Sequence, residues 1–230
     1  MKIKFIVLLA LAGGLFLSGH AYGETKKAGT EKEYFIISTN TALYGGPESG
    51  AKDVLPLNFG DKILLSSGKM KKSRYSVTVN GTNGWVNDSD ISVTPKNWVR
   101  FDGIEGLVIY YPKEYRYQLK KGKPVTDVNQ TYVEHYLFNK VSFVRYTKVK
   151  SIHIISNENK NLVKLDYYGK DAYYDSGNYG EDAYKTFSLV ILDETKKGYD
   201  MIEVVTEKVA PTPEEELIAK KILFSVRLKP

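Results

Sequence analysis

The side chains that most often carry catalysis or bind metals are scarce in this chain. It has no cysteine and three histidines, and one of these, His20, lies shortly after an apolar N-terminal run. The absence of cysteine excludes a thiol nucleophile, a cysteine zinc site and an iron–sulfur cluster. His135 and His153 match no zinc-ligand spacing such as HExxH. The sequence therefore predicts no catalytic residues, no metal site and no cofactor.

Carboxylates are the remaining candidates for catalytic groups, because a glycosidase needs only two of them at a set separation. The chain has 27 acidic residues, and no pair stands out by its spacing. Asp171, Asp175, Glu181 and Asp182 lie close together, but their spacing fits no EF-hand or other calcium loop, so we interpret them as a solvated acidic segment.

Tyrosine is the most unusual feature of the composition. Six of the 18 tyrosines lie between residues 165 and 184, among Gly, Asp and Asn. Tyr presents an amphipathic face at low entropic cost, which suits a loop that binds a glycan or a protein partner. We expect such a partner loop at Tyr173, Tyr174 and Tyr179. The alternative is that these residues simply favour a strand.

The N-terminus has the pattern of a secretory signal peptide. Lys2 and Lys4 precede an apolar run over 5–17, and small residues lie at the −3 and −1 positions of a cleavage site after Gly23. The alternative is an uncleaved anchor. We therefore expect an exported protein of the periplasm or cell surface, with no membrane span after cleavage and with residues 24–33 as a flexible tether.

The net charge gives a weak indication of the partner. Without Lys2 and Lys4, 31 basic residues face 27 acidic ones, a formal charge of +4. This mild excess favours an anionic envelope polymer and is too scattered to indicate nucleic acid.

The clearest structural signal is a β-hairpin over residues 74–91. Its first strand alternates through Tyr75, Val77 and Val79, and Asn80-Gly81 follows as a type I′ turn. With the strands that precede it, the region has five or six short strands with turn residues every eight to twelve positions. Together they predict a small closed β-barrel over residues 34–93.

Residues 34–93 resemble a bacterial SH3 (SH3b) domain. The resemblance rests on Leu43 before Gly46-Pro47, on the segment LNFGDK at 57–62, and on the closing run YSVTVNGTNGWVNDSDIS. One departure is that the family often has Asn-Val-Arg in the first strand, where this chain has Ala-Leu-Tyr at 42–44. A ligand contact by that arginine is therefore not transferred.

The resemblance implies a binding groove between the first long loop and the 69–73 hairpin, for a peptide or a glycan-peptide stem. It implies aromatic groove residues at Tyr44, Tyr75 and Trp85. It implies positive charge toward an acidic ligand at Lys71, Lys72 and Arg74.

Residues 97–230 have the pattern of an α+β domain with a mostly antiparallel sheet, because the gaps between apolar runs are too short for helical crossovers. The expected strands lie at 98–101, 107–111, 115–119, 141–146, 152–155, 162–168, 187–192 and 201–205. Thr212, Pro213 and Glu215 predict the start of a C-terminal helix through a capping box. A final strand is expected over 223–228.

The second region also weakly resembles PsbP/Mog1-like folds. The resemblance rests on the strand and turn GLVIYYP at 106–112 and on the closing helix and strand AKKILFSV at 219–226. It concerns the fold and does not identify a function.

These observations lead to one hypothesis and two alternatives. The hypothesis is a non-catalytic exported binding module, whose SH3b domain docks on peptidoglycan or an envelope protein and positions the α+β domain. The first alternative is a cell-wall hydrolase or glycosidase that uses carboxylates in the second domain. The second is an adhesin or assembly factor that binds through the Tyr-rich loop.

Overall fold

The computed structural model describes residues 32–104, 106–115, 117–119, 132–138, 140–149, 162–179, 184–193, 198–206 and 210–229. The predicted signal peptide and nearly all of the predicted tether lie outside the described residues, as do His153, Glu181 and Asp182 and the expected strand over 152–155. Contacts group Lys32–Pro230 into one compact unit. Among the described residues the fold is mainly β with antiparallel pairing, and one α-helix lies near the C-terminus.

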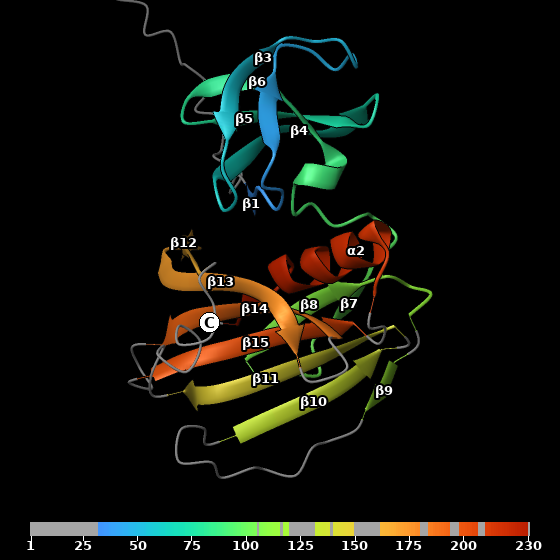
Figure 1. The fold of residues 1–230 in the computed structure, drawn as a ribbon, viewed down its shortest axis with the longest axis vertical. Helices are drawn as coiled ribbons and strands as arrows, with labels where there is room; N and C mark the ends of the chain where they lie inside the picture. Colours follow the sequence, from blue (N-terminus) through green and yellow to red (C-terminus); the bar gives the residue numbers. More distant parts are fainter. Residues whose placement is uncertain are drawn as a thin grey trace, which may run out of the picture. The chain divides into compact units, whose positions relative to one another are not determined.

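The first sheet is formed by residues 33–87 and is curled (Figure 1). Its six strands follow the order β1-β4-β5-β6-β2-β3. They are β1 (Glu33–Phe35), β2 (Thr41–Tyr44), β3 (Asp53–Leu57), β4 (Lys62–Lys71), β5 (Arg74–Val79) and β6 (Thr82–Asn87). A short 3-10 helix, η1 (Asp88–Asp90), follows β6.

Two tight turns set the register of the central strands. Asn80 and Gly81 have φ values of 48° and 80°, which is the left-handed backbone of a type I′ turn, and Val79 pairs with Thr82 across it. The hairpin predicted from Asn-Gly is therefore confirmed. Lys72 and Ser73 also have positive φ and join β4 to β5.

The inner face of the first sheet forms its own hydrophobic core. This core has nine buried residues: Ile36, Leu43, Leu57, Ile63, Val77, Val79, Val86, Ile91 and Val93. Gly84 of β6 lies against Leu43, where a Cβ atom would approach the leucine Cγ to 2.5 Å.

The second part of the chain builds a seven-stranded antiparallel sheet with the order β12-β13-β14-β15-β11-β10-β9. Its strands are β9 (Tyr117–Leu119), β10 (Tyr132–Phe138), β11 (Val141–Val149), β12 (Val163–Tyr167), β13 (Lys170–Tyr179), β14 (Tyr184–Asp193) and β15 (Gly198–Thr206). A three-stranded sheet, β16-β8-β7, contains β7 (Val99–Phe101), β8 (Leu107–Tyr111) and β16 (Arg227–Leu228).

Helix α2 (Pro213–Phe224) begins with the predicted capping box and contacts β8, β14 and β15 (Figure 1). The backbone N–H of Glu215 donates to Thr212 Oγ1 at 3.2 Å, and the N–H of Thr212 donates to Glu215 Oε2 at 2.9 Å. The strand expected over 223–228 is wrong in its first half. Leu223 and Phe224 are fully buried in the last turn of the helix, and only Arg227–Leu228 pairs as a strand.

Aromatic side chains from the first sheet enter the core of the second. Phe35 of β1 is fully buried and stacks on Tyr167 of β12, with 5.0 Å between the ring centroids. Phe59, in the turn after β3, stacks on Tyr174 of β13 at 4.3 Å. Phe35, Ile37 and Phe59 thus pack in the core of the second part of the chain, whereas the inner face of the first sheet keeps its separate core.

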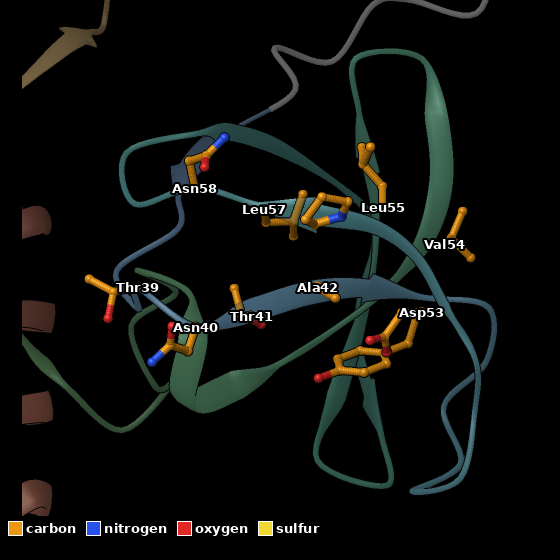
Figure 2. Close-up of a pocket in the computed structure, with 11 residues that line it drawn as sticks. Thr39, Asn40, Thr41, Ala42, Asp53, Val54, Leu55, Leu57 and Asn58 are labelled. Atoms are coloured by element: carbon orange, nitrogen blue, oxygen red, sulfur yellow. The ribbon is translucent and has the colours of Figure 1, made fainter.

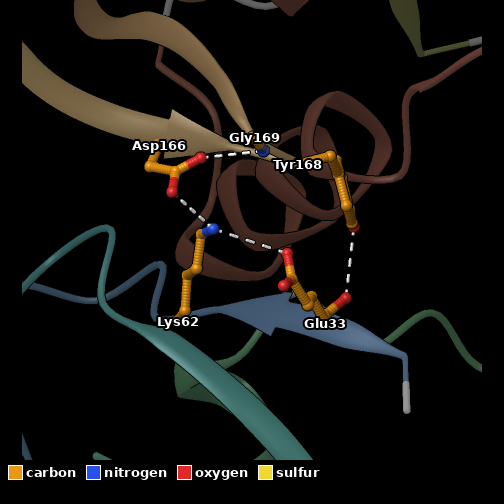
Figure 3. A network of polar contacts seen from close by, with 5 residues as sticks. All are labelled: Glu33, Lys62, Asp166, Tyr168 and Gly169. Carbon is orange, nitrogen blue, oxygen red and sulfur yellow. Dashed lines mark hydrogen bonds and ion pairs between the residues drawn. The ribbon is translucent and has the colours of Figure 1, made fainter. Parts of the chain in front are cut away.

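A network of polar contacts also joins Glu33 and Lys62 to Asp166 and Tyr168 (Figure 3). Lys62 Nζ lies 2.7 Å from Asp166 Oδ2 and 3.6 Å from Glu33 Oε2. The Tyr168 hydroxyl donates to the Glu33 carbonyl at 3.2 Å. Burial raises the pKa of Tyr168 to about 12, so this hydroxyl keeps its proton at neutral pH.

Candidate functional site

A cleft of about 460 Å³ lies at the place where the sequence implied a groove, between the β2–β3 loop and the β4–β5 hairpin. It is lined by Pro47, Glu48, Ser49, Lys72, Ser73, Arg74 and Asn87. We call it the Arg74 cleft. Its three ionisable side chains are one acid and two bases, so the cleft carries a net positive charge.

Arg74 forms the floor of this cleft and fixes the β2–β3 loop. Its Nη1 donates to the carbonyls of Gly46 at 3.0 Å and Glu48 at 2.6 Å, and its Nε donates to Asn87 Oδ1 at 2.9 Å. The guanidinium also lies over the Tyr44 ring, 3.7 Å from its centroid. Arg74 is only 7% exposed, and among the described residues its Nη2 has no hydrogen-bond partner.

The rim of the cleft carries an exposed ion pair between Lys72 and Glu48. The hydrogen bond from Lys72 holds the pKa of the Glu48 carboxyl below its ordinary value, with further lowering from the charges of Lys71 and Arg74. Because both side chains are exposed, this pair adds little stability. The carboxylate of Glu48 therefore occupies a position where a ligand carboxylate would meet the same lysine.

A second hollow, of about 530 Å³, lies along β2 and β3 (Figure 2). We call it the Tyr44 hollow. Its lining residues are Thr39, Asn40, Thr41, Ala42, Tyr44, Asp53, Val54, Leu55, Pro56, Leu57 and Asn58. Figure 2 shows β2 and β3 side by side as its walls, with Thr39 and Asn40 before β2 and Asn58 after β3. Its lining combines side chains that carry hydrogen-bonding groups with apolar ones.

A chain of hydrogen bonds joins the two hollows. Thr41 Oγ1 donates to Asp90 Oδ2 at 2.8 Å, and Asn87 Nδ2 donates to the same oxygen at 2.8 Å. Asn87 then accepts from Arg74 Nε. Together with the stacking of Arg74 on Tyr44, this network makes the wall between the hollows a single rigid unit.

The structure brings together only part of the implied groove. Arg74 and Lys72 line the Arg74 cleft, and Tyr44 lines the neighbouring hollow. Tyr75 and Trp85 are half-buried and line neither of the two. Tyr75 packs against the core of the first sheet, and burial raises the pKa of its hydroxyl. Lys71 is exposed at the end of β4, outside the lining.

The described part of the Tyr-rich segment is mostly strand, which corrects the loop expected from its composition. Residues 170–179 form strand β13 between β12 and β14. Tyr174 is 5% exposed in the main core, and Tyr173 is half-buried against Val190 and Met201. The side chain of Tyr179 lies outside the described residues.

One polar row on the second sheet was missed by the sequence reasoning. Asp175, Ser188 and Glu203 lie directly opposite one another on β13, β14 and β15, so they share a face of the sheet. Ser188 Oγ donates to Glu203 Oε1 at 3.2 Å. Burial raises the pKa of Glu203, while hydrogen bonds from Tyr146 and Ser188 oppose this rise. These acids are unremarkable among 27 in the sequence, and only the strand register places them in one row.

The described residues contain no group of three or more His, Cys, Asp or Glu that could hold a metal ion. No helix in the described part of the chain is long and apolar enough to cross a membrane. Comparisons with protein-family models, with curated proteins and with solved structures find no significant match.

Proposed function

We propose that this protein is a non-catalytic exported binding module, in which residues 34–93 form an SH3b-like barrel that docks on peptidoglycan or an envelope protein. The signal-peptide pattern supports export, and the curled antiparallel sheet with its two tight hairpins supports the SH3-like assignment. The second sheet and α2 are then the part that the barrel positions at the envelope.

The observation that carries this proposal is the prebuilt Arg74 cleft. Arg74 holds the β2–β3 loop in place before any ligand arrives, so binding does not have to order that loop. Lys72 and the remaining N–H groups of Arg74 are hydrogen-bond donors that suit a carboxylate. The expected ligand is therefore a carboxylated peptide, such as a peptidoglycan stem or an acidic stretch of an envelope protein.

The test is co-sedimentation of residues 24–230 with purified sacculi. We expect Lys72→Gln to weaken binding roughly two- to fivefold, the effect of losing one exposed ion pair. Glu48→Gln should strengthen it by a similar factor, because it releases Lys72 from its internal partner. Lys96→Gln removes an exposed lysine outside the cleft lining and is the matched control.

Two results would contradict the proposal. One is a wild-type protein that stays in the supernatant with sacculi and with an envelope extract. The other is equal binding by Lys72→Gln and Lys96→Gln. That result would mean that the protein binds sacculi through its net charge and not through the Arg74 cleft.

The Asp175–Ser188–Glu203 row favours the hydrolase as a second candidate. Asp175 and Glu203 are two strand spacings apart, roughly 10 Å between Cα atoms, and the paired carboxyls of glycosidases lie about 5–10 Å apart. A raised pKa on one of two carboxyls is what a general acid requires. A zymogram in which wall clearing survives chelation and disappears in Glu203→Gln would support it, and the absence of clearing would count against it.

A further inference from the structure

The Tyr44 hollow differs in chemistry from the Arg74 cleft beside it. The side chains of Asn40, Asp53 and Asn58 are exposed and make no hydrogen bond to other described residues. The lining contains no lysine, arginine or histidine, and Asp53 is its only carboxylate. An anionic ligand is therefore disfavoured in this hollow, whereas the cleft favours one.

Side chains of this kind suit a carbohydrate. An asparagine amide both donates and accepts, and an ionised carboxylate accepts two hydrogen bonds, which matches the neighbouring hydroxyl groups of a sugar ring. Tyr44 and Pro56 add apolar surface on which the C–H face of a sugar can lie. The hollow thus combines the polar and apolar contacts that an uncharged, hydroxylated ring makes.

The Tyr44 hollow and the Arg74 cleft are also connected by direct contacts between their walls. The Tyr44 ring of one is stacked on the Arg74 guanidinium of the other, and the Thr41–Asp90–Asn87 bonds link their walls. A ligand that carries a sugar next to a carboxylated peptide would therefore meet two matching, pre-positioned surfaces.

We propose that the Tyr44 hollow is a saccharide subsite, so that the protein recognises the junction between glycan and peptide in peptidoglycan. This inference rests on the proposed function, because the Arg74 cleft is taken as the site of the peptide carboxylate. It narrows the ligand from any acidic envelope peptide to one attached to an amino-sugar strand.

Titration calorimetry with three probes tests the subsite in residues 24–230. The probes are a disaccharide-tetrapeptide muropeptide, the free tetrapeptide and chitotetraose. The double variant Asn40→Ala/Asn58→Ala removes hydrogen-bonding groups from the hollow and leaves Tyr44 in place to support Arg74. Asn97→Ala, at an exposed asparagine outside the lining, is the matched control.

The wild-type protein should bind the muropeptide about tenfold more tightly than the free tetrapeptide, which corresponds to one or two added hydrogen bonds. The double variant should lose this advantage and also its binding of chitotetraose, with tetrapeptide affinity unchanged. Lys72→Gln should weaken the muropeptide and the tetrapeptide but not chitotetraose.

The outcomes separate the two proposals. Equal affinities for muropeptide and tetrapeptide, both unaffected by the double variant, would overturn the saccharide subsite and leave the carboxylate cleft standing. Binding of chitotetraose alone, lost in the double variant, would support the subsite and overturn the cleft. No binding of any probe would overturn both.

Discussion

At the scale of single residues, Arg74 shows why charge alone is a poor guide to a binding role. The SH3b resemblance implied that the charge of Arg74 faces an acidic ligand, but most of its donors hold Gly46, Glu48 and Asn87. Arg74 mainly fixes the β2–β3 loop, and the exposed Lys72 is the cation that a ligand can reach more easily. The sequence could place both residues near the cleft because the hairpin turn was recognisable. It could not show how the donors of Arg74 are divided.

Glu203 gives a residue-scale prediction about pH. Its pKa in the folded protein is raised above the ordinary 4.5 by burial, and the nearby Asp175 adds to the rise. The folded state therefore holds a proton more tightly than the unfolded state. The contribution of Glu203 is most favourable below pH 4.5 and is lost as the pH rises through the folded pKa.

Glu203→Gln should remove this dependence while its side-chain oxygen still accepts a hydrogen bond from Ser188. We expect the free energy of unfolding of the variant, relative to wild type, to increase from pH 4.5 towards neutral pH. Urea unfolding at a series of pH values measures this difference. A difference that stays constant with pH would show that Glu203 titrates normally.

At the scale of elements, alternation and turn chemistry predicted most of the strands but not β10 or β13. The sequence of β13, KDAYYDSGNY, is rich in turn-forming residues, and we expected a loop there. Pairing with β12 on one side and β14 on the other satisfies its backbone and overrides those local preferences. Ala172 and Tyr174 face the core, and that two-residue period was the signal that the composition concealed.

Gly84 gives the element-scale prediction. A Cβ atom there would lie 2.5 Å from Leu43 Cγ and 2.8 Å from the Tyr44 carbonyl, so β2 and β6 would have to separate. We expect Gly84→Ala to destabilise the protein by about 1–3 kcal/mol, the usual cost of overpacking. Gly68→Ala is the control, because a Cβ atom at Gly68 meets nothing within 4 Å. Equal midpoints in urea for both variants would contradict this close approach.

At the scale of the whole molecule, the aromatic contacts of Phe35 and Phe59 join the first sheet to the second part of the chain. Phe35 contacts Tyr167, Tyr168 and Phe224, and all three belong to the second part of the chain. Lys221 of α2, nearly buried, adds an ion pair to Asp88 at 3.0 Å. The sequence analysis did not predict these contacts, because it expected Tyr174 in a binding loop. Cutting the chain near residue 95 would expose these rings, so binding experiments should use the whole compact unit.

The contacts of Phe35, Phe59 and Asp88 with the second part of the chain predict a single unfolding transition for residues 32–230. Val79→Ala deletes buried atoms in the separate core of the first sheet. Phe35→Ala deletes a ring that packs in the core of the second part of the chain. We expect losses of roughly 1–3 and 3–5 kcal/mol respectively. Each loss should reduce hydrogen-exchange protection equally in β5–β6 and in β14–β15. If Val79→Ala lowered protection in the first sheet alone, the two sheets would unfold independently. The first sheet would then be a separate module joined to the second part of the chain only by surface contacts.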